Sequence, residues 1–214
     1  MPTQVGSLRN LEKLYLDSNF LTGTVPDILR NLNSLEDLTL FDNSFVGTIP
    51  LSFQALKKIK RFWLSGNRFS GTIPQFFQDF TQLRYLYLDR NRLSGMIPAF
   101  LSNLQNLRDM RLDHNRLIGC IPVQLFNLEK LKVLYLDNND LFCELYSQIY
   151  VGAALQYLEL SNNRFNGRIP RVPTDDSQLR VLKLDGNDLT GTLPSSLGRL
   201  NNISKFIFIT KICR

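Results

Sequence analysis

Few side chains of this chain could perform chemistry. His114 is the only imidazole among the 214 residues, so a Ser-His-Asp or Cys-His catalytic site would have to use it. It stands near Asp109, Arg111 and Asp113, and neither Ser nor Cys occupies the strand positions beside it in the adjacent repeat units. We therefore interpret His114 as a solvated loop residue, and we predict no catalytic residue and no enzyme.

Other signatures of catalysis are missing as well. Nothing in the sequence isolates one carboxylate from the many others, so no glycosidase acid with a raised pKa is predicted. The chain has no Walker sequence, and its glycines recur at a fixed period instead of forming a Rossmann fingerprint. With one His and three Cys, the sequence predicts no metal site and no cofactor.

These residues belong to a repeat with a period of 24 residues. The repeat unit reads LxxLxLxxNxLxGxIPxxLxxLxx, and eight full units run from Leu11 to Asn202. We expect one domain over 1–214, with partial units at 1–10 and 203–214. The marker of each unit is an Asn at position 9, counting Leu11 as position 1 of the first unit: Asn19, Asn43, Asn67, Asn91, Asn115, Asn139, Asn163 and Asn187.

The physics of the unit predicts a solenoid. The segment xLxLx alternates, which indicates a short strand with Leu on one face. Such a strand cannot bury that face alone, but copies stacked ~4.8 Å apart form a parallel sheet over a shared core. The Asn amide both donates to and accepts from backbone groups, so we expect stacked copies to form a ladder inside the turn. The LxxLxx tail is long enough only for short 3₁₀ or α turns.

The unit resembles the plant-type leucine-rich repeat over essentially the whole chain. Family members with this GxIP segment include the ectodomains of receptor-like kinases and receptor-like proteins, and the polygalacturonase-inhibiting proteins. The resemblance implies an α/β solenoid, a right-handed superhelix with a parallel β-sheet on its concave face and short turns on its convex side. It also implies an extracellular part of a plasma-membrane receptor, acting in signalling or defence, that binds its ligand on the strand face.

Two units and both ends depart from the pattern. In the sixth unit Cys143 and Tyr146 replace the Gly and the Pro, and in the seventh unit Pro173 and Asp176 replace two Leu. These changes indicate either sequence variation in a loop that tolerates substitution or a second contact site near residues 143–154 and 171–178. Neither end resembles a capping unit, which predicts a segment of a longer array, or a truncated gene product, whose ends self-associate or meet a co-receptor.

The cysteines and one asparagine are candidates for modification. Cys120 and Cys143 lie in adjacent units, where stacked positions are ~5 Å apart, so a disulfide is geometrically feasible. The alternative is two unrelated thiols, and Cys213 has no candidate partner. Asn202 is a candidate for N-glycosylation. The chain as given shows no apolar signal core and no run of the ~20 apolar residues that a membrane helix needs, so this segment should not insert into a membrane.

The strand side chains that point away from the core, at positions 3, 5, 7 and 8, form the expected binding surface. Seven of these 32 residues are aromatic, about twice the 11% of the whole chain, and Tyr and Trp often dominate binding. The alternative is that aromatic residues favour strands. The candidate ligand-binding residues are Tyr15, Trp63, Tyr85, Tyr87, Asp89, Arg111, Asp113, Tyr135, Asp137 and Tyr157.

The charge of this surface is opposite to that of the whole chain. The chain has a net charge of +6, but these positions carry five basic and nine acidic side chains. That balance argues against nucleic acid and favours a protein or peptide partner with basic groups. We expect such a group between the surface of Trp63, Tyr87 and Tyr135 and an acidic rank at position 7, defined as Asp89, Asp113 and Asp137.

The sequence therefore favours a non-catalytic scaffold for recognition of a peptide or protein. A secreted inhibitor of a cell-wall hydrolase is the alternative, which the acidic strand face and the missing cysteine caps weaken. A surface-adsorbing protein of the ice-binding kind would need flat, regular ranks of Thr or Asn, and positions 3, 5 and 8 vary too much.

Overall fold

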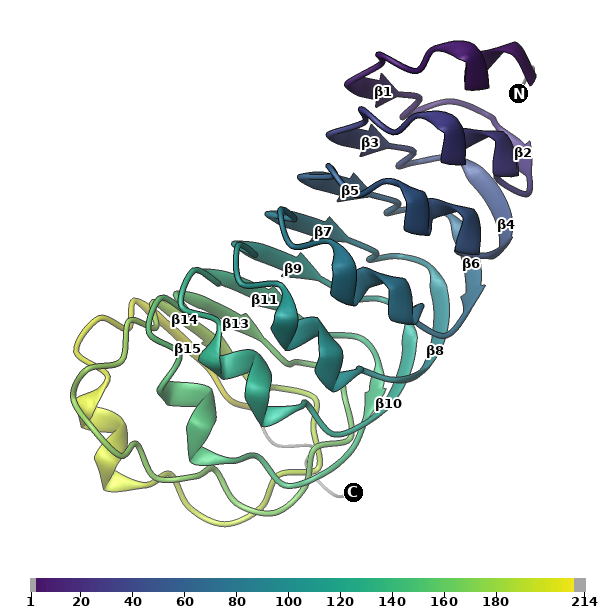
Figure 1. The fold of residues 1–214 in the computed structure, drawn as a ribbon. Helices are drawn as coiled ribbons and strands as arrows, with labels where there is room; N and C mark the ends of the chain where they lie inside the picture. Colours follow the sequence, from purple (N-terminus) through teal and green to yellow (C-terminus); the bar gives the residue numbers. More distant parts are fainter. Residues whose placement is uncertain (1–2, 210–214) are drawn as a thin grey trace.

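Each 24-residue unit folds into one coil of a curved solenoid (Figure 1). The computed structural model describes residues 3–209. Short strands and 3₁₀ turns stack in order along the solenoid, which confirms the parallel repeat fold predicted from the period. In the described part of the chain, no helix has both the length and the hydrophobicity needed to cross a lipid bilayer.

A nine-stranded parallel sheet lines the concave side of the solenoid (Figure 1). Equivalent residues of successive units pair in register, as Leu14 does with Leu38. The central side chain of each strand points into the core, and Leu38 and Leu86 are fully buried. The strands are β1 (Lys13–Tyr15), β3 (Asp37–Thr39), β5 (Arg61–Trp63), β7 (Tyr85–Tyr87), β9 (Asp109–Arg111), β11 (Val133–Tyr135), β13 (Tyr157–Glu159), β14 (Val181–Lys183) and β15 (Lys205–Ile207).

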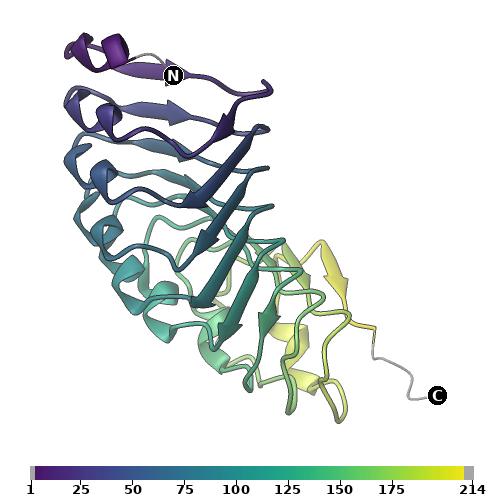
Figure 2. The ribbon, with the colours of Figure 1, turned by 90° about the vertical axis from the view of Figure 1, so that its right-hand side faces the viewer.

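A second parallel sheet, which the sequence analysis did not predict, runs along the flank (Figure 2). Here residues pair 22 apart instead of 24, as Val46 does with Arg68. Buried Phe45, Phe69 and Leu93 anchor this segment, and its backbone groups bond to the neighbouring coil. The strands are β2 (Thr22–Gly23), β4 (Ser44–Thr48), β6 (Arg68–Gly71), β8 (Arg92–Met96), β10 (Arg116–Gly119) and β12 (Asp140–Leu141).

Short 3₁₀ helices form the convex side. Where a Pro precedes them, its fixed φ starts the turn, as Pro50 does with φ −64°. The helices are η1 (Thr3–Ser7), η2 (Asp27–Asn31), η3 (Leu51–Ala55), η4 (Gln75–Asp79), η5 (Ala99–Asn103), η6 (Val123–Asn127), η7 (Ser147–Tyr150) and η8 (Ser195–Arg199). The seventh unit, with its RVPTDDSQ segment, has no such helix between η7 and η8.

The position-9 asparagines join each coil to the next. The Asn139 Oδ1 accepts from the Leu117 backbone N–H at 2.9 Å, and its Nδ2 donates to the carbonyls of Leu112, Leu136 and Asp137 at 3.0, 3.1 and 3.3 Å. The same bonding recurs from Asn43 to Asn187. One side chain thus satisfies groups on two coils inside the turn.

The cysteines and the asparagine that the sequence marks as candidates for modification lie in different parts of the chain. Cys120 and Cys143 are joined by a disulfide, with Cα atoms 5.5 Å apart. The flank sheet ends at β12, in the unit that carries Cys143. Asn202 is exposed, and its Nδ2 donates to the Ser177 carbonyl at 3.0 Å. Cys213 lies outside the described residues.

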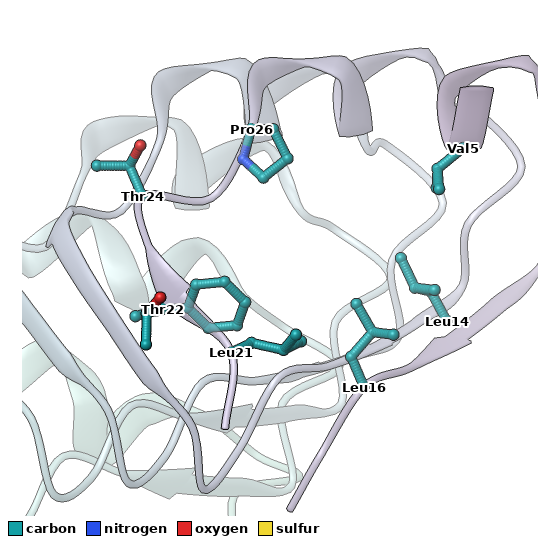
Figure 3. Close-up of a pocket in the computed structure, with 8 residues that line it drawn as sticks. Val5, Leu14, Leu16, Leu21, Thr22, Thr24 and Pro26 are labelled. Atoms are coloured by element: carbon teal, nitrogen blue, oxygen red, sulfur yellow. The ribbon is translucent and has the colours of Figure 1, made fainter. Parts of the chain in front are cut away.

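The N-terminal edge of the solenoid is apolar and incompletely covered. Leu14 and Leu16 are only partly buried there, whereas their equivalents Leu38 and Leu40 are fully buried. A hollow of about 260 Å³ opens between the first coils (Figure 3). Its lining is Val5, Leu14, Leu16, Leu21, Thr22, Thr24, Pro26 and Phe45. The Phe20 side chain beside this edge is 98% exposed.

The ladder yields a stability prediction. Asn139→Leu keeps the number of side-chain heavy atoms but leaves backbone groups of two coils without partners, which should lower the free energy of unfolding by about 2–4 kcal/mol. Urea denaturation measures this loss. The control is Asn162→Gly, which removes an exposed side chain: Gly66 and Gly186 occupy the same repeat position with φ of 64° and 69°, so this substitution should lower the free energy of unfolding by less than about 1 kcal/mol. Equal losses in the two variants would contradict the ladder's role.

The open edge yields a second prediction. The isolated 214-residue chain should self-associate, because an unpaired parallel edge and exposed apolar side chains adjoin at β1 and β2. Phe20→Ser should reduce the association, and Ser44 fills the equivalent position of the next unit. Light scattering over a concentration series checks both statements. A monomer at every concentration would show that the edge is not adhesive.

Candidate functional site

The position-5 side chains of four successive strands meet on the concave sheet. Parallel register places Trp63 beside Tyr87, Tyr87 beside Arg111, and Arg111 beside Tyr135. The rings of Trp63 and Tyr87 stack with centroids 5.1 Å apart and planes 10° apart. The Arg111 Cζ lies 4.6 Å from the Tyr87 centroid and 5.2 Å from that of Tyr135. We call Trp63, Tyr87, Arg111 and Tyr135 the aromatic row.

Arg111 of the chain itself occupies the cation–π position between Tyr87 and Tyr135. The expectation that a partner's basic group lies between these rings and the acidic rank stays a prediction. The Arg111 Nε and one terminal nitrogen donate to the two carboxylate oxygens of Asp109 at 3.2 and 3.1 Å. The Tyr87 hydroxyl donates to the same carboxylate at 2.7 Å. Asp109 is 8% exposed, so this buried acid fixes the arginine and the tyrosine together.

Two shallow hollows adjoin the aromatic row. One, of about 190 Å³, is lined by Phe41, Trp63, Ser65, Tyr87, Asp89 and Arg111. The other, of about 280 Å³, is lined by Tyr15, Asp17, Thr39, Phe41, Arg61 and Trp63. Phe41 and Trp63, with ring centroids 6.2 Å apart, contribute to both hollows. The surface therefore offers ring faces flanked by both signs of charge.

The remaining predicted aromatic residues lie apart from the row or at its side. Tyr15 on β1 is 53% exposed, and its hydroxyl donates to Asp37 at 3.0 Å, a bond that raises the tyrosine pKa. Tyr85 packs edge-on against Tyr87, with centroids 6.4 Å apart. Tyr157 on β13 pairs with no other ring among residues 3–209. The structure thus joins Trp63, Tyr85, Tyr87 and Tyr135. It places Tyr15 in the hollow that Trp63 also lines, and leaves Tyr157 outside this group.

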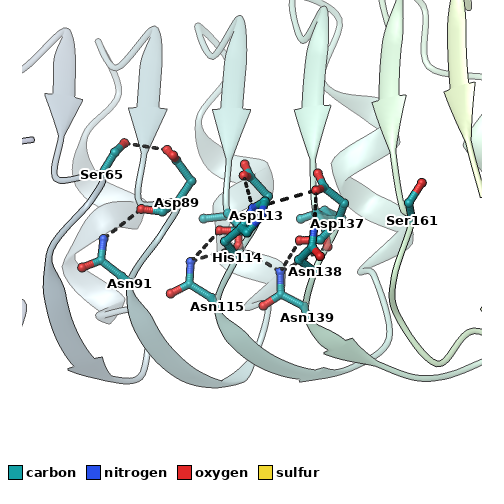
Figure 4. Close-up of polar contacts among 12 residues, drawn as sticks. Ser65, Asp89, Asn91, Asp113, His114, Asn115, Asp137, Asn138, Asn139 and Ser161 are labelled. Carbon is teal, nitrogen blue, oxygen red and sulfur yellow. Dashed lines mark hydrogen bonds and ion pairs between the residues drawn. The ribbon is translucent and has the colours of Figure 1, made fainter. Parts of the chain in front are cut away.

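The acidic rank lies where the strands end and the chain turns off the sheet (Figure 4). The Ser65 hydroxyl donates to Asp89 Oδ1 at 2.5 Å. The Nδ1 of His114 lies 2.9 Å from Asp113 Oδ2 and 3.9 Å from Asp137 Oδ2. Asn138 Nδ2 donates to Asp137 Oδ2 at 2.6 Å. His114 was interpreted as a plain loop residue, yet it lies against two carboxylates of the rank.

Burial changes the acidity of this rank. Desolvation, together with the charges of Asp89 and Asp137, raises the pKa of Asp113 to about 6, while the contact with His114 opposes the shift. Desolvation also raises the pKa of Asp89, although the hydroxyl of Ser65 stabilises its charged form. Stacking at the repeat distance therefore places like charges where water screens them poorly.

Sequence reasoning missed three contributors to the site. Asp109, Phe41 and His114 were not assigned to the binding surface from the sequence. The signal for Asp109 was its place two residues before Arg111, which puts both side chains on one face of β9. For His114 the signal was its place between position-7 aspartates of consecutive units.

Comparison with protein families gives matches along the chain. The model described as leucine rich repeat matches residues 10–32, 34–56, 58–80, 154–174 and 178–200. A second model with the same description matches residues 81–141. Comparison with curated proteins gives no match.

Comparison with solved structures gives plant receptor ectodomains. The plant peptide hormone receptor RGFR1 in complex with RGF2 is 35% identical, with a TM-score of 0.91 over 96% of this chain and 33% of that chain. A TDR receptor is 33% identical, with a TM-score of 0.91 over 98% and 36%. The Arabidopsis receptor kinase HAESA, in complex with the peptide hormone IDA and the co-receptor SERK1, is 29% identical, with a TM-score of 0.81 over 98% and 39%. The chain spans between 33% and 39% of the length of these three structures.

The raised pKa of Asp113 predicts how stability depends on pH. The folded-state pKa of about 6 exceeds the unfolded value of ~4, so the folded state binds this proton more tightly. The contribution of the Asp113 carboxyl to the free energy of unfolding is therefore most favourable below pH ~4 and is lost as pH rises through about 6. Asp113→Asn should raise the free energy of unfolding at pH 7 by about 2 kcal/mol and leave it nearly unchanged at pH 4.

Urea denaturation between pH 4 and pH 8, with a chelator present, checks this expectation. The control is Asp185→Asn at the same repeat position, where the carboxylate accepts a 2.5 Å hydrogen bond from the Ser161 hydroxyl; removing its charge weakens this bond and should not stabilise the protein at pH 7. A constant difference between wild type and Asp113→Asn at all pH values would contradict the assignment of this titration to Asp113.

Proposed function

The chain belongs to the leucine-rich repeat family, and from that premise we propose that it is a non-catalytic scaffold recognising a peptide or protein on its concave surface. The aromatic row carries this proposal. Four large side chains lie side by side across four strands, and Asp109 holds two of them in place. A surface that is rigid before binding loses little conformational entropy on binding, which favours affinity.

The hollows beside the row suit an extended ligand that crosses the strands. An apolar or aromatic ligand side chain fits the hollow formed by Phe41, Trp63 and Tyr87. A basic group of the same ligand would lie toward Asp89, whose side chain lines this hollow. The expected partner therefore carries apolar and cationic side chains in alternation, and a polyanion is disfavoured as a partner.

The receptor role rests on the similar structures. RGFR1 and HAESA are solved in complex with peptide hormones, and HAESA also with a co-receptor. We infer that this chain is the ligand-binding segment of an extracellular receptor ectodomain in signalling or defence, with Asn202 as a glycan acceptor and a disulfide between Cys120 and Cys143. A co-receptor is a candidate for the second contact region near 143–154 and 171–178, where the flank sheet has ended.

Two other functions, adsorption to a surface such as ice and inhibition of a cell-wall hydrolase, receive less support. The concave surface lacks a flat, regular rank of one polar residue type, because position 5 runs through Tyr, Thr, Trp, Tyr, Arg, Tyr, Glu and Lys. That irregularity disfavours adsorption to a crystalline surface. No feature of the aromatic row or of the acidic rank favours a hydrolase inhibitor over a receptor.

A displayed library of random peptides, selected on the immobilised chain, tests the proposed surface. Trp63→Ala and Tyr87→Ala should each weaken the selected peptides by ~1–3 kcal/mol, because each truncation removes a large rigid contact. The controls are Gln54→Ala on η3 and Gln75→Ala on η4, exposed residues of the convex side. Peptides that lose binding in the convex variants and keep it in the concave ones would overturn the assignment of the surface.

A further inference from the structure

At position 7 of the repeat, some aspartates accept a hydrogen bond from a serine hydroxyl of the preceding unit, and others do not. Where a Ser precedes an Asp by one unit, the hydroxyl donates across the coils: Ser65 to Asp89 Oδ1 and Ser161 to Asp185 Oδ1, both at 2.5 Å. Asp113 and Asp137 instead follow Asp89 and Asp113. The preceding coil therefore offers each of them a carboxylate in place of a hydroxyl.

The missing donors leave two carboxylate oxygens unsatisfied. Within residues 3–209, Oδ1 of Asp113 and Oδ1 of Asp137 are both buried and have no hydrogen-bond partner. Asp113 as a whole is 8% exposed. A buried carboxylate oxygen without a donor is costly, and a bound cation is one of the few groups that can compensate two of them at once.

His114 adds a nitrogen ligand to this pair. Its backbone φ of 52° is the left-handed conformation that position 8 also adopts at Asn138 and Asn162. Its ring lies near both carboxylates, with Nδ1 at 2.9 Å from Asp113 Oδ2 and 3.9 Å from Asp137 Oδ2 (Figure 4). One ligand atom from each of Asp113, His114 and Asp137 can be chosen so that all lie within 4.8 Å of one another. Among the described residues this is the only such group of three.

We propose that Asp113, His114 and Asp137 bind a divalent transition-metal ion on the concave surface, with two carboxylates and one imidazole as ligands. This ligand set suits Zn²⁺ or Mn²⁺ better than Ca²⁺ or Mg²⁺, which prefer oxygen alone. The ion replaces the contact between His114 and Asp113 and neutralises the charge that the stacked aspartates share. The site lies beside the aromatic row but does not depend on the ligand proposed for it.

Titration calorimetry of the folded, chelator-stripped chain with ZnCl₂ and then MnCl₂ tests the site. The chain carries Cys213→Ser, so that this thiol does not compete for zinc. One ion should bind per chain, and Zn²⁺ or Mn²⁺ should bind more tightly than Ca²⁺ or Mg²⁺. Asp113→Asn and Asp137→Asn should each weaken binding by about tenfold or more, the loss typical of one group at a metal site.

The decisive variant is His114→Asn. Asn already stands at this repeat position in two neighbouring units with the same φ, so the coil should fold unchanged, as circular dichroism can verify. It should lose about tenfold or more in Zn²⁺ affinity, whereas Asp185→Asn, at the Ser-paired aspartate, should leave affinity unchanged. No saturable binding of either ion, unchanged affinity in His114→Asn, or a preference for Ca²⁺ would each overturn the proposed site.

Discussion

The hydrogen bonds of the position-9 asparagines are the interaction on which the rest of the structure depends. A short strand leaves the sheet at this point, and its turn exposes backbone groups that no helix or long strand can satisfy. The amide accepts from a backbone N–H of the preceding coil and donates to carbonyls on both coils, as Asn139 does. Because the same side chain performs this role from Asn43 to Asn187, successive coils must stack in one register.

That register determines the surface as much as the core. Equivalent residues of neighbouring units stand one strand spacing apart, so any residue type that recurs at one position becomes a row. At position 5 the row makes favourable contacts, because the rings of Trp63 and Tyr87 stack and Arg111 lies between two tyrosine rings. At position 7 the same geometry brings Asp89, Asp113 and Asp137 together, and burial, with the charges of these neighbours, raises the pKa of Asp113. A single constraint therefore produces both the rigid binding surface and its uncompensated charge.

The irregular units show where the constraint is relaxed. The concave sheet continues through all described coils, but the flank sheet ends at β12. In that unit Cys143 and Tyr146 replace the Gly and Pro of the pattern. The disulfide between Cys120 and Cys143 joins the last two coils that still pair on that flank. Beyond it, as far as residue 209, the flank has only isolated bridges, such as that between Glu144 and Asn166. The convex flank can thus vary while the concave sheet and the ladder persist.

The sequence by itself determined the period, the strand positions, the buried leucines, the ladder asparagines and the set of side chains that face the concave side. It could do so because each of these follows from a local pattern that recurs in each full unit, and identical units have one common way to stack. The tertiary structure alone decided the flank sheet, the place of Arg111 between two tyrosines, and the approach of His114 to two aspartates. Those outcomes depend on which of several neighbours, all within reach across the coils, a particular side chain or backbone segment contacts. Arg111 could reach acids and rings on three strands, and the buried carboxylate of Asp109, with the tyrosine rings on either side, selects one arrangement.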